Sequence, residues 1–128
     1  MNLPPPKQLA MGLALARIGI GSVGCLAPGF LMQTWTGMDR RSKQVRAVGL
    51  AVAARDLALG LGMLQAIRSG RNTAVWMRCS ALADAADFLA TVRAFGELPR
   101  GRREIIVLAA AGSAGTAWWL AKEATARS

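Results

Sequence analysis

An adjacent arginine and aspartate in the middle of a long apolar run constrain this chain more than any other feature. Arg55 and Asp56 lie near the centre of the apolar run 45–67. A run of about 20 apolar residues is long enough to cross a bilayer. A charge at the centre of the hydrocarbon costs roughly 2.5–3.5 kcal/mol, so charges there require partners. The pair therefore predicts a membrane helix whose neighbours supply opposite charges.

The rest of the chain divides in the same way into apolar runs separated by basic loops. The four runs span residues 9–31, 45–67, 73–95 and 104–121, and the first is interrupted near Pro28-Gly29. Connections of about 5–10 residues make neighbouring helices antiparallel. We therefore expect one all-α domain over 1–128, a four-helix transmembrane bundle running up-down-up-down, as a multi-pass protein of the cell membrane in contact with the lipid bilayer.

Composition favours a membrane over nucleic acid as the partner of this basic chain. The net charge is +9, and hydrophobic residues make up 53% of the sequence, with fourteen glycines. Small residues let helix backbones approach closely in lipid. The positive charges lie between the apolar runs, where membrane proteins place them. No basic stretch alternates with aromatic residues that would stack on bases, so we expect no nucleic-acid partner.

The four tryptophans lie at the ends of the apolar runs, where membrane proteins place aromatic belts. They are Trp35, Trp76, Trp118 and Trp119. A soluble helical bundle is the alternative, and it gives the tryptophans no reason to follow the ends of the runs. The loops after the first and third runs hold more Lys and Arg than the other side, which places both termini outside.

Enzymatic chemistry is the least favoured of the function classes. The chain has no histidine, which removes the commonest general base and metal ligand. Residues 19–24 match G-x-G-x-x-G, but no βαβ unit surrounds them, so we interpret these glycines as helix-packing positions. Two aspartates three residues apart fit a phosphate-bound divalent metal, yet the further acids that such sites use are missing. We expect no catalytic residue, no metal and no cofactor.

The third run carries a polar stripe on one helix face. Ser80, Asp84, Asp87 and Thr91 are spaced four, three and four residues apart. The first run carries a stripe of small residues around Arg17, which we expect to pack against the third run: Ala10, Ala14, Gly21, Gly24 and Pro28. In lipid such polar stripes face the interior of the bundle.

These stripes predict a buried charge network near mid-membrane. Arg17 and Arg55 are expected to neutralise Asp84 and Asp87, and Asp56 completes the cluster, since all five lie within roughly 5 Å of their run midpoints at 1.5 Å per residue. Arg78 is a sixth candidate, nearer an interface. The network either fixes the register of the helices, or forms a site for a polar solute or proton, or is completed by a partner protein.

Cys25 and Cys79 are expected to be free, buried thiols. The first and third runs cross the bilayer in the same direction, and the two cysteines differ in depth by roughly 15 Å. A disulfide requires Cα atoms within about 7 Å.

Several short motifs resemble those of a known group of proteins. They are Ala54–Gly60 (A-R-D-L-A-L-G), Ala83–Asp87 (A-D-A-A-D), Ala16–Gly19 (A-R-I-G) and the stretch from Ala27-Pro28 to Trp35. Together they resemble the small four-helix membrane proteins of actinobacteria, a family of unknown function. The resemblance implies a four-helix membrane fold and no known reaction.

We therefore expect a non-enzymatic integral membrane protein, an accessory or structural component of a larger membrane complex or a homo-oligomer. The alternative is a small polar-solute or proton-coupled carrier that uses the mid-membrane aspartates. The two differ in what they require of Asp84 and Asp87, because a carrier needs one acid to change charge while a structural lock keeps both paired.

Overall fold

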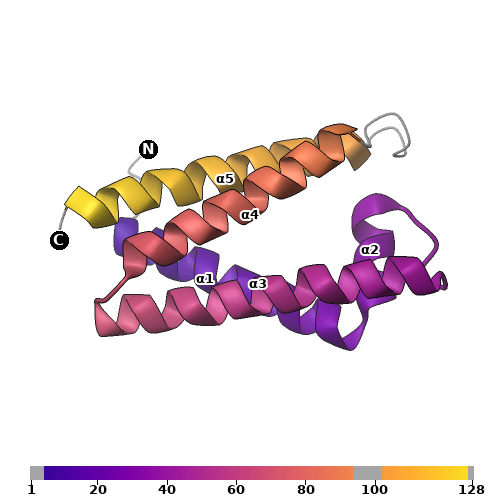
Figure 1. The fold of residues 1–128 in the computed structure, drawn as a ribbon, viewed down its shortest axis with the longest axis horizontal. Coiled ribbons are helices and arrows are strands. Elements are labelled where there is room, and N and C mark those ends of the chain that lie inside the picture. Colours follow the sequence, from indigo (N-terminus) through magenta and orange to yellow (C-terminus); the bar gives the residue numbers. More distant parts are fainter. Residues whose placement is uncertain (1–4, 94–101, 127–128) are drawn as a thin grey trace.

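The computed structural model describes residues 5–93 and 102–126, and in that part of the chain all regular structure is helical, with no strand. The all-α class predicted from the sequence is thus confirmed. The helices, labelled in Figure 1, are α1 (Pro6–Leu26), α2 (Pro28–Thr36), α3 (Lys43–Ser69), α4 (Thr73–Arg93) and α5 (Arg102–Ala126).

The single helix expected over 9–31 is wrong. α1 ends at Leu26 and a separate short helix, α2, begins at Pro28. Proline is favoured in the first turn of a helix, where its missing N–H has no intrahelical acceptor, so Pro28 starts a new helix rather than merely bending the first one. Residues 5–93 and 102–126 therefore form five helices where the sequence predicted four.

The other expected runs correspond to one helix each, with shifted ends. The described part of α4 stops at Arg93, so residues 94 and 95 of the predicted run lie outside the described residues. α5 extends beyond the predicted 104–121 at both ends.

The ends of α3 follow from local chemistry. Ser42 caps its first turn, because the Ser42 hydroxyl accepts a hydrogen bond from the backbone N–H of Val45 at 3.4 Å. At the other end Gly70 adopts a left-handed conformation with φ of 68°, which glycine adopts without a steric penalty. Three residues later Thr73 begins α4.

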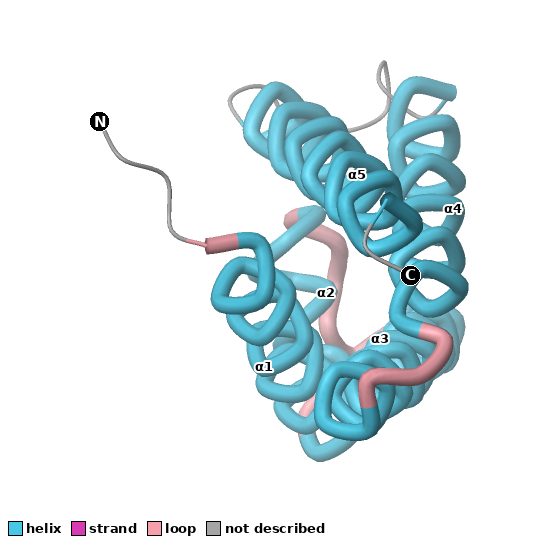
Figure 2. The backbone as a smooth tube through the Cα atoms, turned by 90° about the vertical axis from the view of Figure 1, so that its left-hand side faces the viewer, coloured by secondary structure: helices cyan, strands magenta, loops and turns pink. Residues whose placement is uncertain are grey.

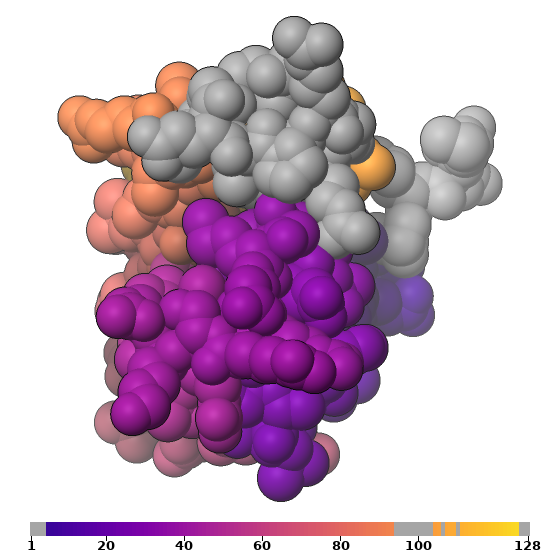
Figure 3. Space-filling view, turned by 90° about the vertical axis from the view of Figure 1, so that its right-hand side faces the viewer, coloured from indigo at the N-terminus to yellow at the C-terminus, as the bar shows by residue number. Residues whose placement is uncertain are grey.

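The long helices form two pairs. α1 packs along α3, and α4 packs along α5, while α3 and α4 make a less extensive contact. Figure 1 shows α3 and α4 joined at one end by a short turn and diverging toward the other, where α2 lies; Figure 2 shows the two pairs in end view. Figure 3 views the opposite end, where α2 lies, and the described surface there is formed largely by α2 and the first turns of α3, in purple and magenta.

Glycines allow α1 and α3 to approach each other closely. A Cβ on Gly21 would lie 2.5 Å from the backbone nitrogen of Leu57, and one on Gly60 would lie 2.8 Å from the backbone nitrogen of Ile18. The stripe of small residues on α1 thus packs against α3. The expectation that it packs against the third run is wrong, because α3 supplies the matching glycine and alanine positions and α4 does not.

A small apolar core fills the end of the bundle near the α3–α4 turn. It draws on all four long helices: Ala10, Ala14, Met63, Ile67, Met77, Leu120 and Ala121. Both cysteines are free thiols, as predicted. Cys79 is exposed, however, and the expectation of burial is wrong for it, because α4 turns Met77, Ser80 and Asp84 inward and Cys79 falls on the opposite side.

Candidate functional site

Arg17 is the centre of the charged cluster. Its Nη1 donates to Asp56 Oδ1 on α3 at 2.8 Å, and its Nη2 donates to Asp84 Oδ2 on α4 at 2.5 Å. Nη2 also lies 3.5 Å from the carbonyl oxygen of Ser80. The Arg17 side chain is only 5% exposed. One guanidinium on α1 therefore joins two other helices inside the bundle.

Arg55 extends the cluster toward the surface. Its Nη1 and Nη2 each lie 2.7 Å from an oxygen of Asp87, a bidentate arrangement, and Nη2 lies 3.1 Å from Asp56 Oδ1. The ion pairs therefore run as one continuous series, Asp87–Arg55–Asp56–Arg17–Asp84. The structure brings together all five charged residues that the sequence singled out, and we refer to them as the charge network.

Ser113 is the residue that sequence reasoning missed. It lies on α5, and its hydroxyl donates to Asp84 Oδ2 at 2.6 Å. A serine among alanines and glycines did not stand out in a run without internal charge. Its position did carry a signal, because Ser113 is the polar side chain nearest the midpoint of the run 104–121.

The other predicted polar residues lie at the edge of the network or away from it. Thr91 donates to the backbone carbonyl of Asp87, one turn earlier in its own helix. Ser80 is fully buried beside Arg17, yet its hydroxyl has no hydrogen-bond partner among the described residues. Arg78 is exposed and donates to Thr125 at 3.2 Å, so it takes no part in the network.

The network carries one excess negative charge. Three carboxylates meet two guanidiniums, and in the described part of the chain no other charged side chain forms an ion pair with them. Arg78, the sixth candidate named from the sequence, would have equalised the charges. Because Arg78 points elsewhere, the network has a formal net charge of −1.

Burial is uneven along the network. The side chains of Arg17, Asp56 and Asp84 are 5%, 11% and 9% exposed, whereas Arg55 is 30% and Asp87 is 41% exposed. The open end lies between α3 and α4, the two helices that diverge in Figure 1. The network is thus enclosed around Arg17 and open at the Arg55–Asp87 pair.

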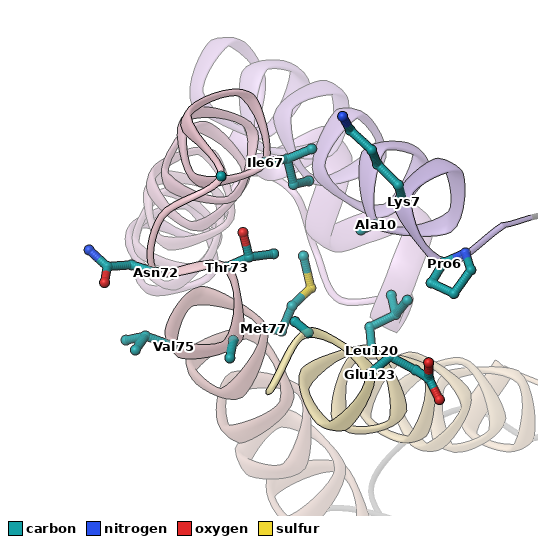
Figure 4. A pocket seen from close by; sticks show the side chains of 13 residues that line it. Pro6, Lys7, Ala10, Ile67, Asn72, Thr73, Val75, Met77, Leu120 and Glu123 are labelled. Carbon is teal, nitrogen blue, oxygen red and sulfur yellow. The ribbon is translucent and has the colours of Figure 1, made fainter. Parts of the chain in front are cut away.

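A separate cavity of about 580 Å³ lies at the end of the bundle beside the α3–α4 turn. Figure 4 shows Ile67, Thr73 and Met77 pointing into it, while Lys7 and Glu123 stand at its edge. Its inner wall belongs to the apolar core, and the network lies about two helical turns deeper in the bundle. The cavity does not include any residue of the network.

Among the helices of the described residues, two have the length and apolar composition to cross a membrane, α1 with 21 residues and α3 with 27. A buried core helix of a soluble protein meets the same criteria. Within the described residues no group of three His, Cys, Asp or Glu side chains is arranged to hold a metal ion. The contacts that the structure shows among the charged residues are ion pairs and hydrogen bonds.

Comparison of the chain with protein-family models, with curated proteins and with solved structures gives no match.

Proposed function

We propose that this chain is an integral membrane protein in which α1, α3, α4 and α5 each cross the bilayer, with α2 near one interface. Support comes from the many large apolar side chains on the outside of the helices. Leu26, Leu82 and Leu108 are 87%, 66% and 72% exposed. Apolar surface on this scale marks contact with a membrane or a partner rather than with water.

We further propose that the protein is a non-enzymatic accessory or structural component of a larger membrane assembly. One observation carries this proposal: all four long helices contribute a polar group to one set of contacts. Arg17 comes from α1, Asp56 from α3, Asp84 from α4 and Ser113 from α5. Buried polar contacts of this kind can fix the register of packed helices.

The surroundings of the network also fit a structural role in fixing helix register better than a transport site. The side chains at its centre are almost fully buried, and the apolar core lies between them and the cavity. Membership of the small four-helix actinobacterial membrane family, suggested by the A-R-D-L-A-L-G and A-D-A-A-D motifs, is part of the same proposal.

Cysteine-accessibility labelling tests the membrane topology. In a background with Cys25→Ala and Cys79→Ala, single cysteines replace Met38, Asn72, Arg93 and Thr125, all exposed positions near helix ends. We expect Met38→Cys and Arg93→Cys to label from one side, and Asn72→Cys and Thr125→Cys from the other. Labelling of Met38→Cys and Arg93→Cys from opposite sides would exclude four spanning helices.

Purification in a mild detergent tests the accessory role. We expect the protein to migrate within a complex larger than its own oligomers, and the variant Arg17→Gln to dissociate from it as the helices lose register. A protein that purifies only as a monomer, and whose Arg17→Gln variant behaves identically, would contradict the structural role.

A polar-solute or proton-coupled carrier is the second candidate. The observation that favours it is a pair of buried polar atoms at the centre of the network, the Ser80 hydroxyl and Arg17 Nε, that have no partner in the part of the chain that the structure describes. Buried polar atoms without partners in the protein are commonly met by water, and water in the network would accompany transport. Proton flux into reconstituted vesicles that is lost with Asp84→Asn would favour the carrier over the lock.

A further inference from the structure

The most unusual feature of the outer surface is an ion pair that is only partly buried. Asp87 is 41% exposed and its partner Arg55 is 30% exposed, and both lie within the middle part of their helices. If α3 and α4 span the bilayer as proposed above, this pair lies at the depth of the hydrocarbon. Charged groups at that depth are expensive unless they face the inside of a bundle, a water-filled space or another polar group.

The formal charge of the network adds to the cost of exposing this ion pair to lipid. The network has three carboxylates for two guanidiniums, and its less buried end is the Asp87 end. The bidentate contact with Arg55 occupies both oxygens of Asp87, yet Arg55 also serves Asp56. One more positive charge near Asp87 would make the network neutral.

The surface around the pair permits another helix to come close. On α3 the exposed neighbours of Arg55 one turn away are Ala51 and Ala58. The other two neighbours at helical spacing, Val52 and Leu59, are half-buried. On α4 the exposed Ala90 follows Asp87 by one turn. Small side chains let helix backbones approach within hydrogen-bonding reach of polar groups in lipid.

We propose that this face, formed by Arg55, Asp87, Ala51, Ala58 and Ala90, docks a transmembrane helix of another membrane protein that carries one lysine or arginine near its midpoint. The proposal rests on the membrane embedding proposed above. The partner's basic group approaches Asp87 and makes the network neutral. A second copy of this chain is disfavoured as the occupant, because it would bring another network of charge −1 to the same face.

Designed helices serve as the probe. Three Leu/Ala-rich peptides of about 21 residues, long enough to cross a bilayer, carry Arg, Leu or Glu at the central position. Each is reconstituted with the protein in phosphatidylcholine vesicles.

Energy transfer is measured between the labelled peptide and a dye at Met38→Cys in the cysteine-free background. We expect the Arg peptide to associate roughly tenfold more tightly than the Leu peptide, the usual size of a polar contact between helices in lipid. The Glu peptide should associate no better than the Leu peptide.

Two variants locate the contact. Asp87→Asn should reduce association of the Arg peptide to the level of the Leu peptide, whereas Asp39→Asn, in the exposed loop before α3, should leave it unchanged. Ala58→Leu keeps every charge and covers the face, so it should also weaken association. Ala16→Leu is its matched control, an exposed alanine on α1 and not on the docking face.

Three results would overturn the inference: equal association of the Arg and Leu peptides, a preference for Arg that survives Asp87→Asn, or self-association of the protein that Asp87→Asn abolishes. The topology labelling separates these results from a failure of membrane embedding. A protein that shows the expected labelling pattern but no preference for the Arg peptide disproves the docking face alone.

Discussion

Arg17 Nη1 lies 2.8 Å from Asp56 Oδ1, and this contact leaves Nη2 of the same guanidinium to reach a third helix. Among the described residues, Arg17 is the side chain through which α1 forms an ion pair and hydrogen bonds with α4, beside the apolar contacts of the shared core. The fold consists of two helix pairs, α1 with α3 and α4 with α5, and the charge network connects them.

Replacing Arg17 should therefore be the most damaging single change to the network. Arg17→Gln leaves Asp56 and Asp84 buried with less compensation, and removing one partner of a buried ion pair costs about 3–5 kcal/mol. Thermal unfolding of the detergent-purified protein measures the loss. Lys7→Gln, an exposed change on the same helix, is the control. A loss for Arg17→Gln no larger than that of the control would mean that the pairs contribute nothing to stability.

Replacing Asp84 should be less damaging than replacing Arg17. In Asp84→Asn the guanidinium of Arg17 still has Asp56, so two guanidiniums face two carboxylates. We expect a loss of about 1–3 kcal/mol, the size of a disrupted buried hydrogen bond. The double variant Arg17→Gln/Asp84→Asn should be more stable than the sum of the two losses predicts. Strictly additive losses would show that the two side chains do not interact.

The close contact of α1 with α3 should be sensitive to one added methyl group. A Cβ on Gly21 would lie 2.5 Å from Leu57 N and 2.8 Å from Ala53 O, both backbone atoms that cannot rotate away. Gly21→Ala is therefore expected to destabilise the protein by about 1–3 kcal/mol. Gly12→Ala on the same helix, where a Cβ meets nothing within 4 Å, should be neutral or stabilising by up to about 1 kcal/mol. Equal melting temperatures for both variants would contradict the observed packing of α1 on α3.

The sequence predicted the charged residues of the site well and the helix pairing poorly. Arg17, Asp56 and Asp84 are conspicuous because any charge inside an apolar run has to be explained, and their similar depth indicated that they meet. Pairing was harder to predict, because a stripe of small residues shows which face of α1 can pack closely but does not identify the helix that packs there. The match of Gly21 to Ala53 and Leu57 on α3 became visible only in three dimensions.

Two other features, the break at Pro28 and the direction of Arg78, show how far local sequence patterns predict the structure. The sequence showed an interruption at Pro28, but a proline can mark either a bend within one helix or the first turn of a new helix. The structure shows the second, since α2 begins at Pro28. Arg78 lies in an apolar run as Arg17 does, yet it points outward to Thr125. Helical periodicity places it about 120° around α4 from Asp84 and about 180° from Asp87. Checking each charge against that periodicity would have removed Arg78 from the network and revealed the excess negative charge.

Ser113 provides a test of whether α5 belongs to the same polar contact set. Its hydroxyl is the only described side-chain group of α5 that donates to the network, at 2.6 Å from Asp84. Ser113→Ala removes this hydrogen bond and leaves Asp84 paired with Arg17, so we expect a loss of about 0.5–1.5 kcal/mol.

Thr116→Ala is the matched control, since the Thr116 hydroxyl is exposed and donates to the carbonyl of Gly112 within its own helix. In the variant Arg17→Gln the same Ser113→Ala change should cost more, because the serine is then the remaining donor to Asp84 in the described part of the chain. The absence of any cost in both backgrounds, measured by thermal unfolding in one detergent, would show that α5 is held by apolar packing alone.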